Sequence, residues 1–216
     1  MKIDKNKQTI EAYDKNPKHY SKMFDSYDVR TEDIDRAIKL NKSGSNNTIE
    51  LGCGNGRDAR YMVFRLSPVN YRGIDASEGL VKLARENVPQ GEFYVKDIRK
   101  LSFEPETFGI IFSFATLLHV KQEELSEIIK KCQKWLKNGG ILYISTKYGE
   151  YKELLIENLG DQKYYYSYLP EDIIKMAGTG FETVYSIIHD SDYGPELVMA
   201  LKKIGGSPET NNLANL

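Results

Sequence analysis

The sequence predicts an α/β protein with a doubly wound, mostly parallel sheet and helices on both faces. Strand-like and helix-like segments alternate from residue 48 to residue 146, which is the pattern of a parallel sheet with right-handed crossovers. Three glycines at alternate positions, Gly52, Gly54 and Gly56, directly follow the first strand. The last two strand-like runs are joined by only "SDYGP", which is too short for a parallel crossover and fits an antiparallel hairpin.

The alternating segments predict five parallel strands. We expect these at residues 48–51, 71–75, 92–97, 108–114 and 141–146. The fourth, "FGIIFSF", is almost continuously apolar, as expected for a central strand that is covered on both faces. The intervening helices are expected at residues 57–66, 77–87 and 121–137, and "KNGG" would end the last of them as a glycine C-cap.

The two ends of the chain depart from this alternation. Residues 18–42 read as helical, with an apolar stripe, and the "KSGSNN" turn ends this segment. The closing hairpin is expected at residues 181–190 and 196–204. The segment 205–216 reads as a flexible tail.

Length and charge restrict the classes of function. The chain has 216 residues, enough for one domain with a full core, and we expect this domain over residues 1–204, with residues 1–42 as a helical cap. Lys and Arg total 30 against 31 Asp and Glu, for a formal charge of -1. Nucleic-acid binders usually carry a basic excess or stripe, so the composition argues against a nucleic-acid partner.

Cysteine usage and hydropathy exclude further classes. Cys53 and Cys132 are the only cysteines and lie far apart, without a CxxC pair or a Cys/His cluster, so no metal site is expected. The start is charged and lacks the apolar core of a secretory signal. No apolar run approaches the roughly 18 residues of a membrane span. We therefore expect a cytoplasmic protein without a membrane partner.

The glycines lie between the first strand and the next helix, where open α/β sheets bind ligands. Glycine lets the backbone approach a ligand, and the amides at a helix start point outward as donors; a tight turn without a ligand is the alternative. Asp75 ends the second strand and Asp97 ends the third. The Asp75 carboxylate could accept both hydroxyls of a ribose or cap the next helix. The glycine loop, Asp75 and Asp97 thus follow three successive strands, and together they predict one ligand site.

Five segments then carry a family resemblance. "IELGCGNG", "YRGIDASEGLVKLAREN", "FYVKDIRKLSF" and "FGIIFSFATLLHV" resemble the first four motifs of class I S-adenosylmethionine-dependent methyltransferases, and "CQKWLKNGGILYIS" resembles their post-motif segment. The resemblance covers about residues 10–204. It implies a seven-stranded sheet of order 3-2-1-4-5-7-6 with strand seven antiparallel. It also implies S-adenosylmethionine as the cofactor, but it leaves the substrate open because the fold hosts many chemistries.

The resemblance implies contacts for each part of this cofactor. Glu50 and the glycine loop would hold the methionyl part, and Asp75 would accept from the ribose hydroxyls. Ala76 would pack on the adenine. Asp97, together with the backbone of Ile98, would read its exocyclic amine.

The same resemblance implies a floor and a cover for the cofactor. Ser113 and Phe114 would line the floor near the sulfonium. Tyr13 and Tyr20 resemble the N-terminal aromatics that close over the cofactor, although ordinary packing of a covering helix is the alternative. The cofactor-binding residues expected are therefore Tyr20, Glu50, Gly52, Cys53, Gly54, Asn55, Gly56, Asp75, Ala76, Ser77, Asp97, Ile98, Ser113 and Phe114.

The chemistry of a sulfonium makes modest demands on the protein. The methyl group is open to in-line attack, so the protein mainly has to hold the nucleophile close and collinear, and a base is needed only if the acceptor arrives protonated. His119 follows the fourth strand, at the reacting end of the site, and is the candidate base. Its alternative role is to cap or orient the helix that begins near residue 121.

Acceptor recognition is expected where members of this fold differ, in the N-terminal helices and in an insertion over residues 147–178. Four tyrosines would overhang the pocket: Tyr164, Tyr165, Tyr166 and Tyr168. Alternatively, alternate tyrosines form an edge strand or pack the hairpin. An aromatic wall with one or two cations suits a small, partly apolar or carboxylate-bearing acceptor. The substrate-binding residues expected are Tyr13, His119, Lys147, Tyr148 and Tyr165.

Four functions remain open from the sequence. The leading one is methyl transfer to an O or N atom of a small-molecule or peptide-like acceptor, by a monomer or homodimer. The second is an RNA methyltransferase of the tRNA wobble type, which a basic concave face would favour. A NAD-dependent oxidoreductase expects GxGxxG, whereas here the third glycine comes one residue early. The fourth is a non-catalytic cofactor-binding module.

Overall fold

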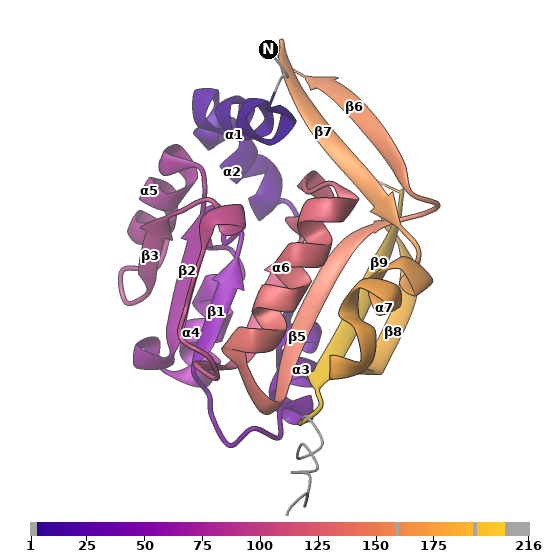
Figure 1. The fold of residues 1–216 in the computed structure, drawn as a ribbon. Helices are drawn as coiled ribbons and strands as arrows, with labels where there is room; N and C mark the ends of the chain where they lie inside the picture. Colours follow the sequence, from indigo (N-terminus) through magenta and orange to yellow (C-terminus); the bar gives the residue numbers. More distant parts are fainter. Residues whose placement is uncertain (1–3, 159, 192–193, 206–216) are drawn as a thin grey trace, which may run out of the picture.

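The computed structural model describes residues 4–158, 160–191 and 194–205. Figure 1 shows a twisted central sheet, with helices in front of it and behind it. The predicted C-terminal tail, apart from its first residue, lies outside the described residues.

The central sheet contains the strands that the sequence predicts, in the order β3-β2-β1-β4-β5-β9-β8. Strands β1 to β5 pair in parallel, whereas β9 is antiparallel to both β5 and β8. This arrangement is the 3-2-1-4-5-7-6 order, with β8 and β9 as the sixth and seventh strands, so the predicted fold class is confirmed. The bounds are β1 Thr48–Leu51, β2 Tyr71–Asp75, β3 Glu92–Val95, β4 Phe108–Phe114, β5 Leu136–Tyr148, β8 Phe181–Ser191 and β9 Gly194–Lys203.

Two further strands extend the sheet, so the described residues form nine strands and the expected seven-strand count is corrected. Strands β6 (Lys152–Asn158) and β7 (Asp161–Tyr168) form an antiparallel hairpin within the predicted insertion. Strand β9 pairs with β5 along most of its length, and β7 pairs with the end of β5 in parallel, at Lys147 and Tyr148. The insertion therefore carries the sheet beyond the strand ends (Figure 1).

Each face of the sheet has its own apolar core. One core joins β1, β4, β5 and β9 to two helices, α6 and α7, through buried residues such as Leu125, Ile129 and Ile173. The other joins the sheet to α3, α4 and α5, through residues such as Ile34 and Met62. All of β4 is buried, as expected for a central strand. The helices are α1 Lys5–Lys15, α2 Pro17–Asp25, α3 Thr31–Leu40, α4 Ala59–Leu66, α5 Glu78–Asn87, α6 Gln122–Trp135 and α7 Pro170–Ala177.

Two predicted helix boundaries are wrong. The segment expected to be helical over residues 18–42 contains two helices, α2 and α3, with a break at residues 26–30 that lines the cavity described below. The helix expected to end at "KNGG" ends at Trp135. Leu136 is buried and pairs with Phe108, so the chain is already extended there, and the left-handed Gly139 (φ 76°) lies within β5 and does not cap a helix.

Candidate active site

A cavity of about 1300 Å³ lies at the carboxyl ends of β1, β2 and β4, which is where ligands bind in open α/β sheets. Its floor is formed by the loops that follow these strands. Helix α1 and strand β7 form one wall, through Tyr13, Lys163 and Tyr165. The opposite wall comes from residues 27–33 and from the β8–β9 hairpin.

The glycine loop turns sharply beneath this cavity. The amides of Gly52 and Cys53 both donate to the Ile74 carbonyl, at 2.6 and 2.9 Å. A Cβ atom on Gly52 would lie 1.8 Å from Oγ1 of Thr116, so this glycine is required by the protein's own loop after β4. Gly54 has a left-handed backbone (φ 53°) and faces the cavity, so it is the glycine whose absent side chain leaves room for a ligand.

Asp75 connects the second strand to this loop. Its Oδ2 accepts from the Gly54 amide at 2.9 Å, and its Oδ1 accepts from the Ser77 amide at 2.9 Å. Burial raises the pKa of the carboxyl. Ser77, and not Asp75, caps α5, because its hydroxyl accepts from the Leu80 amide at 3.2 Å. Each Asp75 oxygen keeps a second lone pair, so the carboxylate can still accept from a ligand.

Glu50 is a second carboxyl at the cavity, and it is only 2% exposed. The Tyr71 hydroxyl donates to its Oε2 at 2.5 Å. Burial raises the pKa of Glu50 to about 8, and the nearby Asp58 carboxylate acts in the same direction. The side chain therefore carries a proton at neutral pH and would become ionised beside a cation.

Asp97 lies at the cavity edge but is already paired. Its Oδ2 accepts from the Arg99 guanidinium at 2.8 Å, and its Oδ1 accepts from the Arg99 amide at 2.9 Å. Arg99 also approaches Asp4 and Glu124. A ligand amine would have to share the Asp97 carboxylate with this arginine.

His119 and Tyr13 meet at the rim of the cavity. Nδ1 of His119 lies 2.7 Å from the Tyr164 carbonyl, and Nε2 lies 3.0 Å from the Tyr13 hydroxyl. Because a carbonyl only accepts, Nδ1 carries the proton, and Nε2 accepts from Tyr13. Burial lowers the pKa of His119 to about 4, so the imidazole is neutral at physiological pH.

The structure brings most of the expected site residues together and leaves five out of the cavity lining. The lining includes Tyr13, Glu50, Gly52, Cys53, Gly54, Asn55, Asp75, Ala76, Asp97, Ile98, Phe114, His119, Lys147 and Tyr165. The Ser113 hydroxyl donates to the Leu51 carbonyl at 3.2 Å, inside the sheet, and Tyr148 packs on the apolar core. Tyr20, Gly56 and Ser77 also lie behind the lining, with Tyr20 fully buried. The roles expected for all these residues stay predictions.

Strand β7 separates the expected tyrosine wall into two faces. Tyr164, Tyr166 and Tyr168 belong to the core, which fits the edge-strand alternative, and Tyr165 lines the cavity. Side chains two apart share a strand face, so Lys163 lies beside Tyr165. Sequence reasoning did not identify Lys163, although this alternation would have indicated it.

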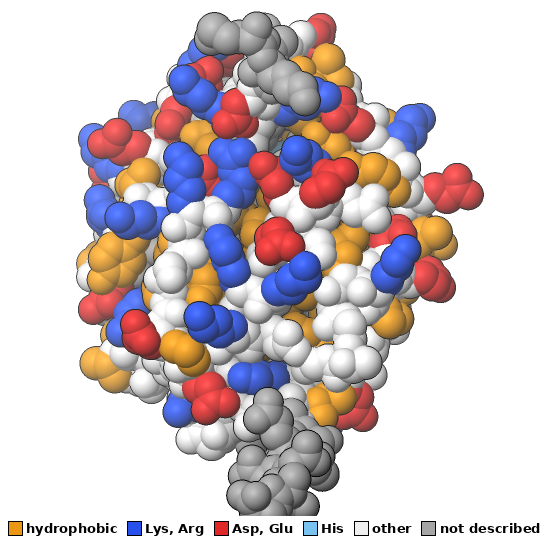
Figure 2. Space-filling model, viewed as in Figure 1, with side chains coloured by type: hydrophobic (Ala, Val, Ile, Leu, Met, Phe, Trp, Pro, Cys, Tyr) orange, Lys and Arg blue, Asp and Glu red, His pale blue; other side chains and the backbone are white. Residues whose placement is uncertain are grey.

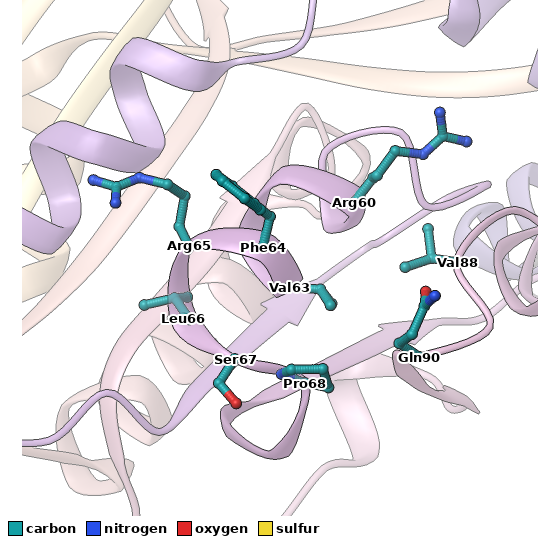
Figure 3. A pocket seen from close by; sticks show the side chains of 9 residues that line it. All are labelled: Arg60, Val63, Phe64, Arg65, Leu66, Ser67, Pro68, Val88 and Gln90. Carbon is teal, nitrogen blue, oxygen red and sulfur yellow. The ribbon is translucent and has the colours of Figure 1, made fainter.

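A second hollow, on α4 and the turn after it, offers little chemistry (Figure 3). Phe64 on its rim is 80% exposed. No Asp, Glu, His or Cys is present among its lining residues, which are Arg60, Val63, Phe64, Arg65, Leu66, Ser67, Pro68, Val88 and Gln90. Catalytic groups therefore gather only in the larger cavity of the two.

The surface and the described helices bear on possible partners. On the face that Figure 2 shows, Lys and Arg side chains are interleaved with Asp and Glu. None of the helices in the described part of the chain combines the length and hydropathy that a membrane crossing requires. Within the same ranges, no three His, Cys, Asp or Glu side chains are grouped to hold a metal ion.

Residues 49–140 match the model of the methyltransferase domain family. Phosphoethanolamine N-methyltransferase of Plasmodium falciparum is 29% identical over 126 residues, which cover 57% of this chain and 46% of that protein. Ubiquinone biosynthesis O-methyltransferase of Coxiella burnetii is 28% identical over 147 residues, covering 66% and 59%. The chain thus spans about half the length of these curated relatives.

Solved structures share the fold. An S-adenosylmethionine-dependent methyltransferase of Clostridium acetobutylicum has a TM-score of 0.67 at 14% identity, covering 90% of this chain and 100% of its own. Magnesium protoporphyrin IX methyltransferase of Synechocystis, solved with bound S-adenosylmethionine, has a TM-score of 0.62 at 14% identity, covering 94% and 86%. The matched segment, the strand order and the reversed last strand are those expected of the class I S-adenosylmethionine-dependent methyltransferases, which this chain resembles.

Proposed function

We propose that the protein transfers a methyl group from S-adenosylmethionine to an oxygen or nitrogen atom of a small-molecule or peptide-like acceptor. The observation that carries the proposal is the shared cavity. It joins the glycine loop and the strand-end carboxylates to a wall with Tyr13, His119 and Lys163. One cavity thus offers a cofactor side and an acceptor side.

The residues present fit this cofactor. Gly54 presents bare backbone to the cavity, and Asp75 has free lone pairs for ribose hydroxyls. Glu50, held protonated by burial, is placed to ionise next to a cationic methionyl group. When bound, the cofactor supplies a sulfonium that makes its methyl group an electrophile.

The chain's own residues would orient the acceptor and accept its proton. His119 offers a neutral Nε2 on the cavity side, and the Tyr13 hydroxyl holds this nitrogen in place. Helix α1 covers the cavity through Asn6, Thr9 and Tyr13 and so limits the access of water to the reacting atoms. The main contribution of such a site is the alignment of the two reactants.

The class of acceptor is inferred from the relatives and from the side chains of the cavity wall. The two curated relatives named above act, by their names, on a phosphorylated amine and in ubiquinone biosynthesis, so N and O acceptors both remain within the proposal. Tyr13 and Tyr165 provide aromatic surface, and Lys147 and Lys163 provide cations. This wall suits a small acceptor that is partly apolar and partly charged.

The test is to incubate the protein with radiolabelled methyl donor and fractionated cell extract. We expect label in the small-molecule fraction, or in peptide. Label only in RNA would contradict the proposal and support the wobble-base alternative, and that activity would fall steeply with added salt. Donor binding without transfer to any fraction would instead indicate a non-catalytic module.

The proposal also covers the cellular location and the oligomeric state of the protein. Cys53 and Cys132 are both buried, and neither forms a disulfide, which suits a reducing compartment. We therefore place the protein in the cytoplasm, acting as a monomer or homodimer. Size-exclusion chromatography with light scattering tests the assembly.

A further inference from the structure

Lys163 is a buried cation at the acceptor wall. Lys163 is only 3% exposed, yet it lines the cavity. Lysine is rarely buried to this degree unless it is paired. Its position therefore calls for a partner.

Three tyrosines surround the ammonium group. Nζ lies 4.1 Å from the ring centre of Tyr20, 4.9 Å from that of Tyr13 and 5.9 Å from that of Tyr165. Aromatic faces attract a cation, but they offset only part of the loss of hydration that a buried ammonium suffers. The rings fix the position of the charge without neutralising it.

Lys163 has no directly contacting counter-ion among the described residues; the Asp161 carboxylate acts on it only over a longer distance. No hydrogen bond or ion pair reaches its Nζ from any residue in these ranges. The nearest acid along the strand, Asp161, is bound instead to Lys15 at 2.5 Å, and Asn16 approaches its other oxygen at 3.4 Å. Burial lowers the pKa of Lys163 to about 8, so it is still mainly a cation at neutral pH.

A second unsatisfied donor lies in the same cluster. The Tyr20 hydroxyl is buried and has no hydrogen-bond partner in the described part of the chain. Tyr20 is also the ring nearest to Lys163. Two buried donors without acceptors, one of them positively charged, match the requirements of an anion.

We propose that Lys163 binds a negatively charged group, a carboxylate or a phosphate, on the methyl acceptor. This inference rests on the proposed function and narrows it to anionic acceptors. Tyr13 links the two parts of the wall, because its ring faces Lys163 and its hydroxyl contacts His119. The anionic group would therefore be held next to the candidate base.

To test the proposal, the titration of Lys163 is monitored by NMR in protein with isotope-labelled lysine side chains. Titrations are run in chloride, acetate and inorganic phosphate at matched ionic strength, and the Lys163→Arg spectrum assigns the resonance. We expect an anion that binds to raise the midpoint of Lys163 by about one unit. Lys130, exposed and paired with Glu127 at 2.8 Å, is the internal control and should not respond.

The two anions distinguish the sources of the charge. A response to phosphate alone indicates a phosphorylated acceptor, and a response to acetate alone indicates a carboxylate. The same midpoint in all three salts would overturn the proposal.

A second measurement separates binding from a structural role. Lys163→Met removes the buried charge and keeps much of the volume, so we expect its urea midpoint to equal or exceed that of the wild type. The matched control is Lys5→Met, because Lys5 also lies over a tyrosine ring, 5.2 Å from the centre of Tyr164, but is paired with Glu153. A clear loss of stability in Lys163→Met but not in Lys5→Met would mean that Lys163 stabilises the fold and would contradict a binding role.

Failure of this inference can be told apart from failure of the proposed function. Calorimetry of S-adenosylmethionine binding tests the cofactor side, and Lys163→Met should leave that affinity within about twofold of the wild type. An anion response without any cofactor binding would keep the anion site and refute the methyltransferase proposal.

Discussion

The Tyr13 hydroxyl lies 3.0 Å from Nε2 of His119, and this contact joins the first helix to the loop after β4. The other ring nitrogen is held by the Tyr164 carbonyl at 2.7 Å. Both ring nitrogens are thus hydrogen-bonded. Nε2 can accept a proton from a substrate only when the Tyr13 hydroxyl moves away or relays the proton. The reactivity of His119 therefore depends on a residue more than 100 positions earlier in the chain.

Replacement of His119 tests its role as base. We expect His119→Ala to lower kcat by about 10²-fold or more, the usual range for a general base, with a smaller change in KM. Tyr13→Phe removes one hydroxyl and should lower kcat roughly tenfold. His19→Ala is the control, since His19 is exposed and lies outside the cavity lining. A loss below about threefold in His119→Ala would remove it from the role of base.

The low pKa of His119 also predicts acid sensitivity. In the folded protein this pKa is about 4, against an ordinary value of 6.5, so the unfolded chain binds the proton more tightly. The stability that depends on His119 is complete above about pH 6.5 and falls as the pH drops toward 4, by roughly 3 kcal/mol in total. Urea unfolding of wild type and His119→Gln at pH 7 and pH 5 measures this difference. An equal pH dependence in both proteins would contradict it.

Glu50 predicts the opposite dependence. Its pKa is about 8 in the folded protein against an ordinary 4.5, so the folded state holds this proton more tightly. Stability from this group is complete below about pH 4.5 and is lost as the pH rises through 8, by about 5 kcal/mol. Glu50→Gln should remove this loss, so its free energy of unfolding should exceed that of the wild type at pH 8.5. Denaturant titrations at pH 5 and pH 8.5 make the comparison.

The glycine loop offers a matched pair of substitutions for cofactor binding. Gly54 (φ 53°) and Gly44 (φ 72°) share a left-handed backbone, but only Gly54 faces the cavity, and Gly44 has open space around it. We expect Gly54→Val to abolish S-adenosylmethionine binding in calorimetry and Gly44→Val to retain it. Asp75→Ala should also abolish binding, because Asp75 both faces the cavity and holds the Gly54 amide. Retained affinity in both Gly54→Val and Asp75→Ala would place the cofactor elsewhere.

The parallel core of the fold could be predicted because its signals are local. A buried strand such as residues 108–114 reads as an apolar run, and a short connection such as "SDYGP" excludes a crossover. The lining of the cavity by Gly54 and Asp75 follows from one rule, that strand ends in a parallel sheet share an edge, whereas only the family resemblance predicts Glu50.

The remainder depends on contacts distant in sequence. Gly52 is glycine because Thr116 occupies the space of its side chain, and no local pattern shows this. The strand alternation places Lys163 beside Tyr165, but its burial depends on α1, which places Tyr13 over it. The β6–β7 hairpin is stabilised partly by α1, through the Tyr164 amide, which donates to the Thr9 hydroxyl at 3.0 Å.

Helix α1 and the β6–β7 hairpin are fastened to each other at both ends of their contact. Lys5 pairs with Glu153 at 2.6 Å, and Lys15 pairs with Asp161 at 2.5 Å. A ligand that enters or leaves past this seam has to part these two ion pairs. Lys5 and Glu153 are both partly exposed, so their pair is screened by salt, whereas Asp161 of the second pair is buried. We therefore expect ligand exchange to become faster as the ionic strength rises, while the rate of the methyl-transfer step stays constant. Ionic strength would then change the rate of ligand exchange without changing the rate of the reaction.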